Sequence, residues 1–151
     1  MNVLILLHML AAVLWVGGMF FAYVVLRPAA VEMLEPPHRL RLWDGVFRRF
    51  FGWVWGAIGL ILLTGLYLIY QYGGLAHSPH HVHVMLLLGL LMMVIYGYVF
   101  FACYIPFNLA VSHGRWKEAG EVLGKIRRLV ALNLALGVIT LAVAETGVLW
   151  G

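Results

Sequence analysis

Four long stretches of uncharged, mostly apolar residues constrain the fold of this sequence more than any other feature. They cover residues 3–26, 50–71, 82–111 and 129–150, and the only charged side chain within them is Glu145. About 20 consecutive apolar residues suffice to cross the hydrocarbon core of a bilayer. We therefore predict four transmembrane segments, which should be helices because a helix satisfies its own backbone hydrogen bonds in lipid.

The composition of the chain agrees with this prediction. Its 151 residues are 64% hydrophobic and 11% charged, whereas about a quarter of the residues in a soluble domain are charged. A soluble domain of this length could not bury so much apolar surface. This excludes a soluble enzyme, a disordered chain and a nucleic-acid-binding protein. The length allows one domain over residues 1–151, and we detect no internal repeat of clear register.

The basic residues predict the orientation in the membrane. All ten lie in the connections 27–49 and 112–128, whereas the connection 71–81 has no formal charge. The positive-inside rule places both basic connections in the cytoplasm. We therefore predict an all-α integral membrane protein of the bacterial inner membrane, an up-down bundle of four transmembrane helices with both termini outside, in the periplasm. Each basic connection has room for a short amphipathic helix at the headgroups.

Two histidines lie at the same predicted depth near the outer face. His8 is in the first span and His83 is in the third, and these two spans lie on a diagonal of an up-down bundle. An iron porphyrin needs one axial nitrogen on each side of its plane. The pair therefore predicts bis-histidine ligation of haem b, with Trp15 and the small Gly18 on the cofactor side of the first helix. Hydrogen bonding to neutral neighbours and core packing are the alternatives for these residues.

Other polar residues lie at the outer end of the predicted bundle. Glu145 is one turn from the end of the fourth span and could orient an imidazole or relay a proton as a catalytic group. Tyr70 could bind a porphyrin propionate, because no arginine lies at this end. His77, His80 and His81, together with His83, form a cluster that could bind copper. A solvated loop without a metal is the alternative.

Several motifs resemble those of the copper-resistance D (CopD) superfamily. They are the opening helix, with His8, Trp15 and Gly17-Gly18, the entry to the third span at His81-Val-His-Val-Met85, and the segment 127–137. The resemblance implies copper passage across the inner membrane. It also implies a relation to the HemJ-type protoporphyrinogen oxidases, which bind haem b. In those enzymes a lysine stands where this chain has Met85, so the oxidase activity is not expected here.

These observations leave three functions open. The first is a haem b protein that transfers electrons between a quinol and a periplasmic acceptor. The second is a copper-binding or copper-transport protein that works with a periplasmic copper carrier. The third is an accessory membrane subunit without chemistry of its own. In each case the chain could form a homo-oligomer.

Overall fold

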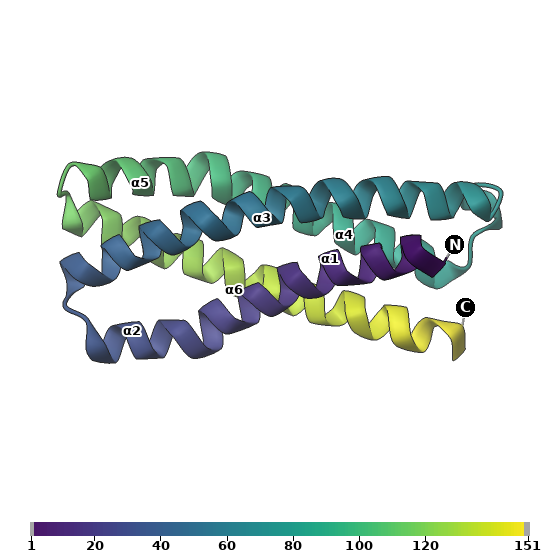
Figure 1. Cartoon of the computed structure of the whole chain (residues 1–151), viewed down its shortest axis with the longest axis horizontal. Coiled ribbons are helices and arrows are strands. Elements are labelled where there is room, and N and C mark those ends of the chain that lie inside the picture. The colour runs from purple at the N-terminus through teal and green to yellow at the C-terminus, as the bar shows by residue number, and fades with distance from the viewer. Residues whose placement is uncertain (1, 150–151) are drawn as a thin grey trace.

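The structure is a computed structural model that describes residues 2–149, with Val148 described by its backbone alone (Figure 1). Within this range the chain is helical and contains no β-strand. The α-helices are α1 (Asn2–Phe20), α2 (Arg27–Met33), α3 (Pro36–Gln71), α4 (His80–Tyr98), α5 (Ile105–Ser112) and α6 (Trp116–Thr146). Two π-helical segments, η1 (Phe21–Leu26) and η3 (Val99–Tyr104), join α1 to α2 and α4 to α5, and the short 3₁₀ turns are η2 (Leu75–His77) and η4 (Gly147–Leu149).

Four continuous helical segments are long and apolar enough to cross a membrane. They cover residues 2–33, 36–71, 80–112 and 116–146, which confirms the four predicted helical spans. Large apolar side chains such as Leu63, Leu87 and Val94 are exposed on the outside of the bundle. An apolar surface of this kind is typical of helices that face lipid. The predicted end of the fourth span, residue 150, lies outside the described residues.

The helices extend further than the predicted spans at the end that carries the basic residues. The amphipathic pieces predicted within connections 27–49 and 112–128 are parts of the long helices rather than separate helices. The ends of these helices lie at residues that favour a helix start or a turn. Pro36 begins α3, because its fixed φ suits the first helical turn and its missing N–H is not needed there. Gly114, with φ of 68°, turns the chain between α5 and α6.

Each π-helical segment directly precedes a helix with proline as its second residue. Pro28 follows η1, and Pro106 follows η3. A proline inside a helix lacks the N–H and its ring clashes with the carbonyl four residues earlier. The wider π turn relieves this clash, and its one extra residue rotates all later side chains by about 100° around the helix axis. The hydrophobic face of each of these spans therefore changes direction at its π segment.

The chain consists of two consecutive helical hairpins whose elements match in order and length. α1 and α4 have 19 residues each, and both π segments have 6. α2 has 7 residues and α5 has 8, and each is followed by one long helix, α3 with 36 residues and α6 with 31. The two hairpins form an internal structural repeat, which the sequence analysis did not detect.

Buried positions of the long helices follow the same repeat. Those of α3 include Leu40, Phe47, Val54 and Ile58, and those of α6 are Ala119, Ile126, Asn133 and Gly137. The spacing between successive positions is the same in the two helices. The paired arginines Arg48-Arg49 and Arg127-Arg128 stand at matching places after the second position. The halves therefore correspond in position although their residue types differ.

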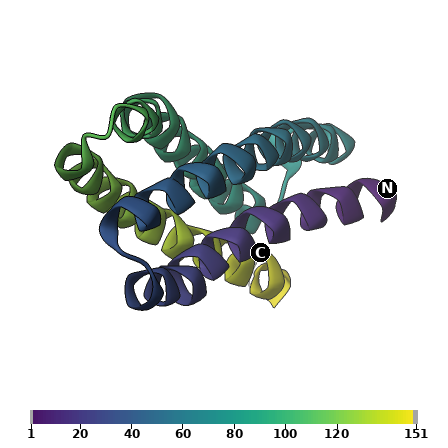
Figure 2. The ribbon, with the colours of Figure 1, turned by 60° about the vertical axis from the view of Figure 1, so that its left-hand side comes forward.

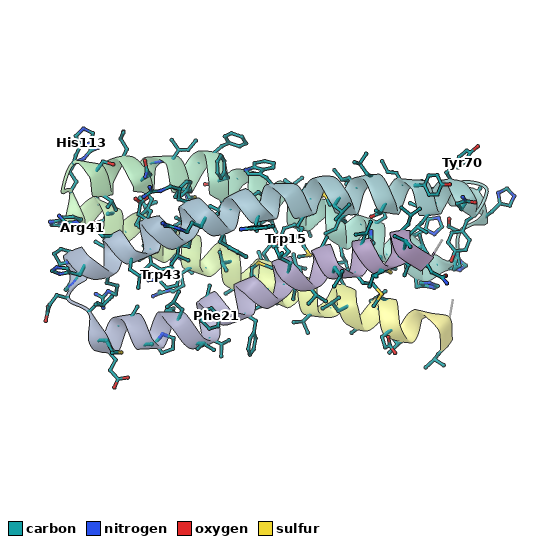
Figure 3. The ribbon with its side chains drawn as sticks, in the orientation of Figure 1. Trp15, Phe21, Arg41, Trp43, Tyr70 and His113 are labelled. Atoms are coloured by element: carbon teal, nitrogen blue, oxygen red, sulfur yellow. The ribbon has the colours of Figure 1, made fainter. Side chains whose placement is uncertain are left out.

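The two ends of the bundle have different chemistry. The turns at residues 34–35 and 113–115 lie together at the left of Figure 1, which we name the basic end. The 72–79 connection and the first and last described residues lie at the other end, named here the uncharged end. Figure 3 shows Arg41 and His113 at the basic end and Tyr70 at the uncharged end. The protein core is aromatic, and Phe47 and Phe51 stack there with ring centroids 5.0 Å apart.

Candidate functional site

His8 is held between the two helices of the first hairpin by a chain of hydrogen bonds. α1 packs chiefly against α3, as Figures 1 and 2 show. The Nδ1 atom of His8 lies 2.8 Å from Oγ1 of Thr64, and this hydroxyl donates to the carbonyl of Leu60 at 2.6 Å. Because the only hydrogen of the hydroxyl is used for Leu60, His8 must donate Nδ1–H to Thr64. The lone pair of the neutral imidazole is then on Nε2.

Gly65 provides the space for this imidazole. A Cβ atom at residue 65 would lie 3.1 Å from Cε1 of His8, so a larger residue would press on the ring. Thr64 is 4% exposed and His8 is half-buried. The ring is therefore fixed in position and in tautomer, and both are properties that metal-binding histidines need.

Two histidines of the cluster within residues 77–83 have the same tautomer as His8, because each bonds to a backbone carbonyl. Nδ1 of His77 lies 3.2 Å from the carbonyl of Gly73, and Nδ1 of His83 lies 3.1 Å from the carbonyl of Pro79. A carbonyl only accepts, so Nδ1 carries the proton in both rings. Both side chains are exposed. Their Nε2 lone pairs are thus available for an ion at the uncharged end.

His80 and His83 lie on the first turn of α4 with ring centroids 6.5 Å apart. An imidazole nitrogen lies about 1 Å from its ring centroid and about 2 Å from a bound ion, so two rings that share an ion are separated by roughly 6 Å or less. A small side-chain rotation would bring these two rings within that range. Within residues 2–149, however, no three His, Cys, Asp or Glu side chains are grouped closely enough to hold a metal ion.

His81 occupies a different environment from the other loop histidines. Its ring lies against Gly147, where an added Cβ would overlap it. Its Nδ1 atom is buried and has no hydrogen-bond partner among the described residues. Burying a polar atom without a hydrogen-bond partner costs free energy. Nδ1 of His81 is therefore the atom of the histidine cluster that still lacks a partner among the described residues.

The predicted haem ligands do not face one another through an open space. His8 contacts α3, whereas α4 packs chiefly against α6 and the His83 ring is exposed beside its own helix. Trp15 is 3% exposed, and its ring meets the ring of Tyr96 edge-on at 6.1 Å. Gly18 lies against the ring of Phe50. On this face of α1, aromatic side chains therefore fill the space that the sequence analysis expected for a flat cofactor.

The remaining predicted site residues lie on the surface of the uncharged end. Glu145 is exposed on the last turns of α6 and forms no ion pair with another described residue. Tyr70 is 76% exposed and has the ring of Tyr67 as a neighbour at 6.4 Å. Neither side chain contacts the imidazole of His8 or His83 through a hydrogen bond within residues 2–149.

Thr64 is a site residue that the sequence analysis did not include among the candidates. A signal for it was present, because His8 lies near the start of the first span and Thr64 near the end of the second. In an antiparallel hairpin these two positions have the same depth. A histidine and a hydroxyl at one depth on paired helices indicate an interhelical hydrogen bond.

One of three comparisons with known proteins found a matching family. The family described as "Copper resistance protein D" matches residues 44–146. This range includes Thr64, the four histidines within residues 77–83 and Glu145, but it begins after α1 and so leaves out His8. No curated protein and no solved structure matches the chain. Because the family match covers more than half of the residues, the chain belongs to the copper resistance protein D family.

Proposed function

We propose that the protein binds copper ions as its substrate at the uncharged end of the bundle and passes them into or out of the membrane domain. The observation that carries this proposal is the gathering of four histidines within residues 77–83, inside the range matched by the copper resistance family. Imidazole nitrogen is a good ligand for copper. The exposed Nε2 atoms of His77 and His83 are suited to first contact with the ion.

The ligands of the proposed capture site would come together only when the ion binds. The rings of His80 and His83 need a small rotation to share one ion, and His81 offers a buried nitrogen without a partner in the described structure. The thioethers of Met9 and Met85 would supply soft ligands for Cu(I) at the same end. A site assembled from loosely held ligands suits a substrate that must also leave.

His8, with its fixed tautomer, is the proposed next ligand along the path. Its Nε2 lone pair is set by the hydrogen bond to Thr64. Glu145 would add a negative charge at the same end of the bundle, which lowers the energy of a cation there. We propose a bacterial inner-membrane location with the uncharged end in the periplasm, where a periplasmic copper carrier would deliver or receive the ion.

A copper titration of the purified full chain tests this function. The variant with His77, His80 and His81 replaced by alanine should lose at least about tenfold in copper affinity, as removal of metal ligands predicts. The matched control is His113→Ala. His113 is exposed and bonds to the carbonyl of Leu109 at 2.9 Å in the same manner, but it lies at the basic end. Equal affinity of the triple variant and the wild type would refute the capture site.

The haem b hypothesis, with electron transfer between a quinol and a periplasmic acceptor, stays a prediction and has less support. The family match describes copper resistance, and the His83 ring is exposed with Nδ1 bonded to Pro79. The reduced-minus-oxidised visible spectrum distinguishes the two functions. A haem protein ligated by His8 and His83 would show a low-spin spectrum that each alanine variant alters, whereas the copper function predicts no such band.

A further inference from the structure

A cavity of about 470 Å³ lies at the basic end of the bundle, far from the histidine cluster. It is bounded by η1, α2 and the first turns of α3 and α6. Its wall combines aliphatic and aromatic side chains, with Tyr23, Trp43 and Trp116 among the aromatic ones. The volume is within the range of roughly 300–1,000 Å³ that small-molecule sites occupy.

The cavity is strongly positive. Arg27, Arg39 and Arg127 line it, and none of its described lining residues is acidic. These three arginines form no ion pair within residues 2–149, whereas Arg48 pairs with Asp44 and Arg115 with Glu118. Arginines placed together without a counterion attract an anion, and the planar guanidinium groups are suited to bind phosphate through two hydrogen bonds.

The internal repeat shows that the fold itself does not require this cavity. In the second hairpin the matching space is filled, because Phe107 is fully buried and Asn108 donates to Asp44 at 2.7 Å. In the first hairpin the residues at the same places after the proline are Ala29 and Ala30. The two hairpins therefore differ at this place, where α2 has small side chains and α5 has larger ones.

We propose that this cavity binds one anionic phospholipid from the leaflet at the basic end. The arginines would hold the headgroup phosphate, and the aromatic and apolar wall would take the glycerol and the start of the acyl chains. Anionic lipids concentrate near basic segments at this leaflet, and basic pockets between membrane helices are suited to their headgroups. A soluble phosphate ester has the same headgroup chemistry but lacks the acyl chains.

Native mass spectrometry of the detergent-purified full chain tests the proposal. The probes are phosphatidylglycerol, phosphatidylcholine with the same acyl chains, and glycerol phosphate. Phosphatidylglycerol should bind at least about tenfold more tightly than either of the others. The double variant Arg39→Gln/Arg127→Gln should weaken its binding by about tenfold for each arginine, as expected for the loss of one charge-assisted hydrogen bond.

A matched charge control is the double variant Lys117→Gln/Arg128→Gln, which removes two exposed cations of α6 that do not line the cavity. It should change binding less than about threefold, as screening of exposed charges predicts. Equal losses in the two double variants would overturn the proposal, because they would indicate attraction to the whole basic end. Equal binding of phosphatidylglycerol and glycerol phosphate would also overturn it in favour of a small-anion site.

A second variant blocks the cavity without removing charge. Gly124 lines the cavity, and a Cβ atom added there meets no other atom within 4 Å. Gly124→Leu should therefore fold and fill the space, and phosphatidylglycerol binding should fall by at least about tenfold. The control is Gly52→Leu, at an exposed position of α3 with the same freedom around its Cβ. Unchanged binding by Gly124→Leu would show that the lipid lies elsewhere.

Discussion

Replacing Thr64 with valine separates the hydrogen bond at His8 from the packing around it. Valine has nearly the shape of threonine, and residue 64 is 4% exposed, so the substitution opens no cavity. It removes the acceptor for Nδ1–H of His8 and the donor to Leu60. Without the threonine hydroxyl the Nδ1–H group loses this acceptor, and the proton moves in part to Nε2, the nitrogen proposed to bind copper.

The size of the effect follows from the hydrogen bond that is lost. Bonds between membrane helices contribute about 0.6 kcal/mol on average, so the stability of the bundle should fall by less than about 1 kcal/mol. Loss of a group that orients a ligating histidine typically lowers metal affinity by about 10- to 100-fold. Thr64→Val should therefore fold normally and bind copper at His8 at least about tenfold more weakly. Thr64→Ser retains the hydroxyl and should restore the affinity.

Two measurements check this prediction independently. Nitrogen NMR of the imidazole rings reports which nitrogen of His8 carries the proton, and competition with a Cu(I) chelator reports the affinity. An unchanged tautomer in Thr64→Val would refute the role of Thr64 in placing the proton on Nδ1. A changed tautomer with unchanged copper affinity would remove His8 from the copper path.

Three further predictions concern packing and orientation. Gly137→Ala should destabilise the bundle by about 1–3 kcal/mol in a detergent unfolding assay, because the new Cβ would lie 2.7 Å from a stiff valine of α1, whereas Gly89→Ala, with open space around its Cβ, should not. Tyr96→Phe should cost about 1 kcal/mol in the same assay, because the hydroxyl donates to a backbone carbonyl of α3 at 2.8 Å; an unchanged transition contradicts this. An impermeant maleimide should label Ser78→Cys in intact cells but Ser112→Cys only after permeabilisation, and the opposite pattern would reverse the proposed orientation.

The spans could be predicted from the sequence because lipid imposes a strong and simple requirement on residue type. Helix within both basic connections could also be expected from the sequence, whereas the points at which these helices end depend on single residues such as Pro36 and Gly114. The π segments before Pro28 and Pro106 relieve a clash between the proline ring and a backbone carbonyl, which a hydropathy profile does not detect. Each π segment also rotates the later side chains around the helix axis. A regular helical periodicity continued through the segment therefore assigns these side chains to the wrong face.

The repeat was missed because apolar side chains substitute for one another in such helices. Val54 and Asn133 occupy matching buried positions, although one is apolar and the other donates to the carbonyl of Met92. The candidate site was predicted in composition but not in geometry. The depth of His8 could be read from the sequence, whereas the direction of the His83 ring depends on a rotamer that bonds it to the carbonyl of Pro79.

The two matched hairpins also have a consequence for how the chain enters the membrane. Each hairpin crosses twice and returns to the side on which it began, so joining a second copy keeps every turn on the same side as its counterpart. A repeated unit with an odd number of crossings would end on the opposite side of the membrane. Its second copy would therefore have the inverted orientation. The basic residues beside both turns predict the same direction of insertion. We therefore expect the basic residues of one turn to be sufficient to orient the molecule.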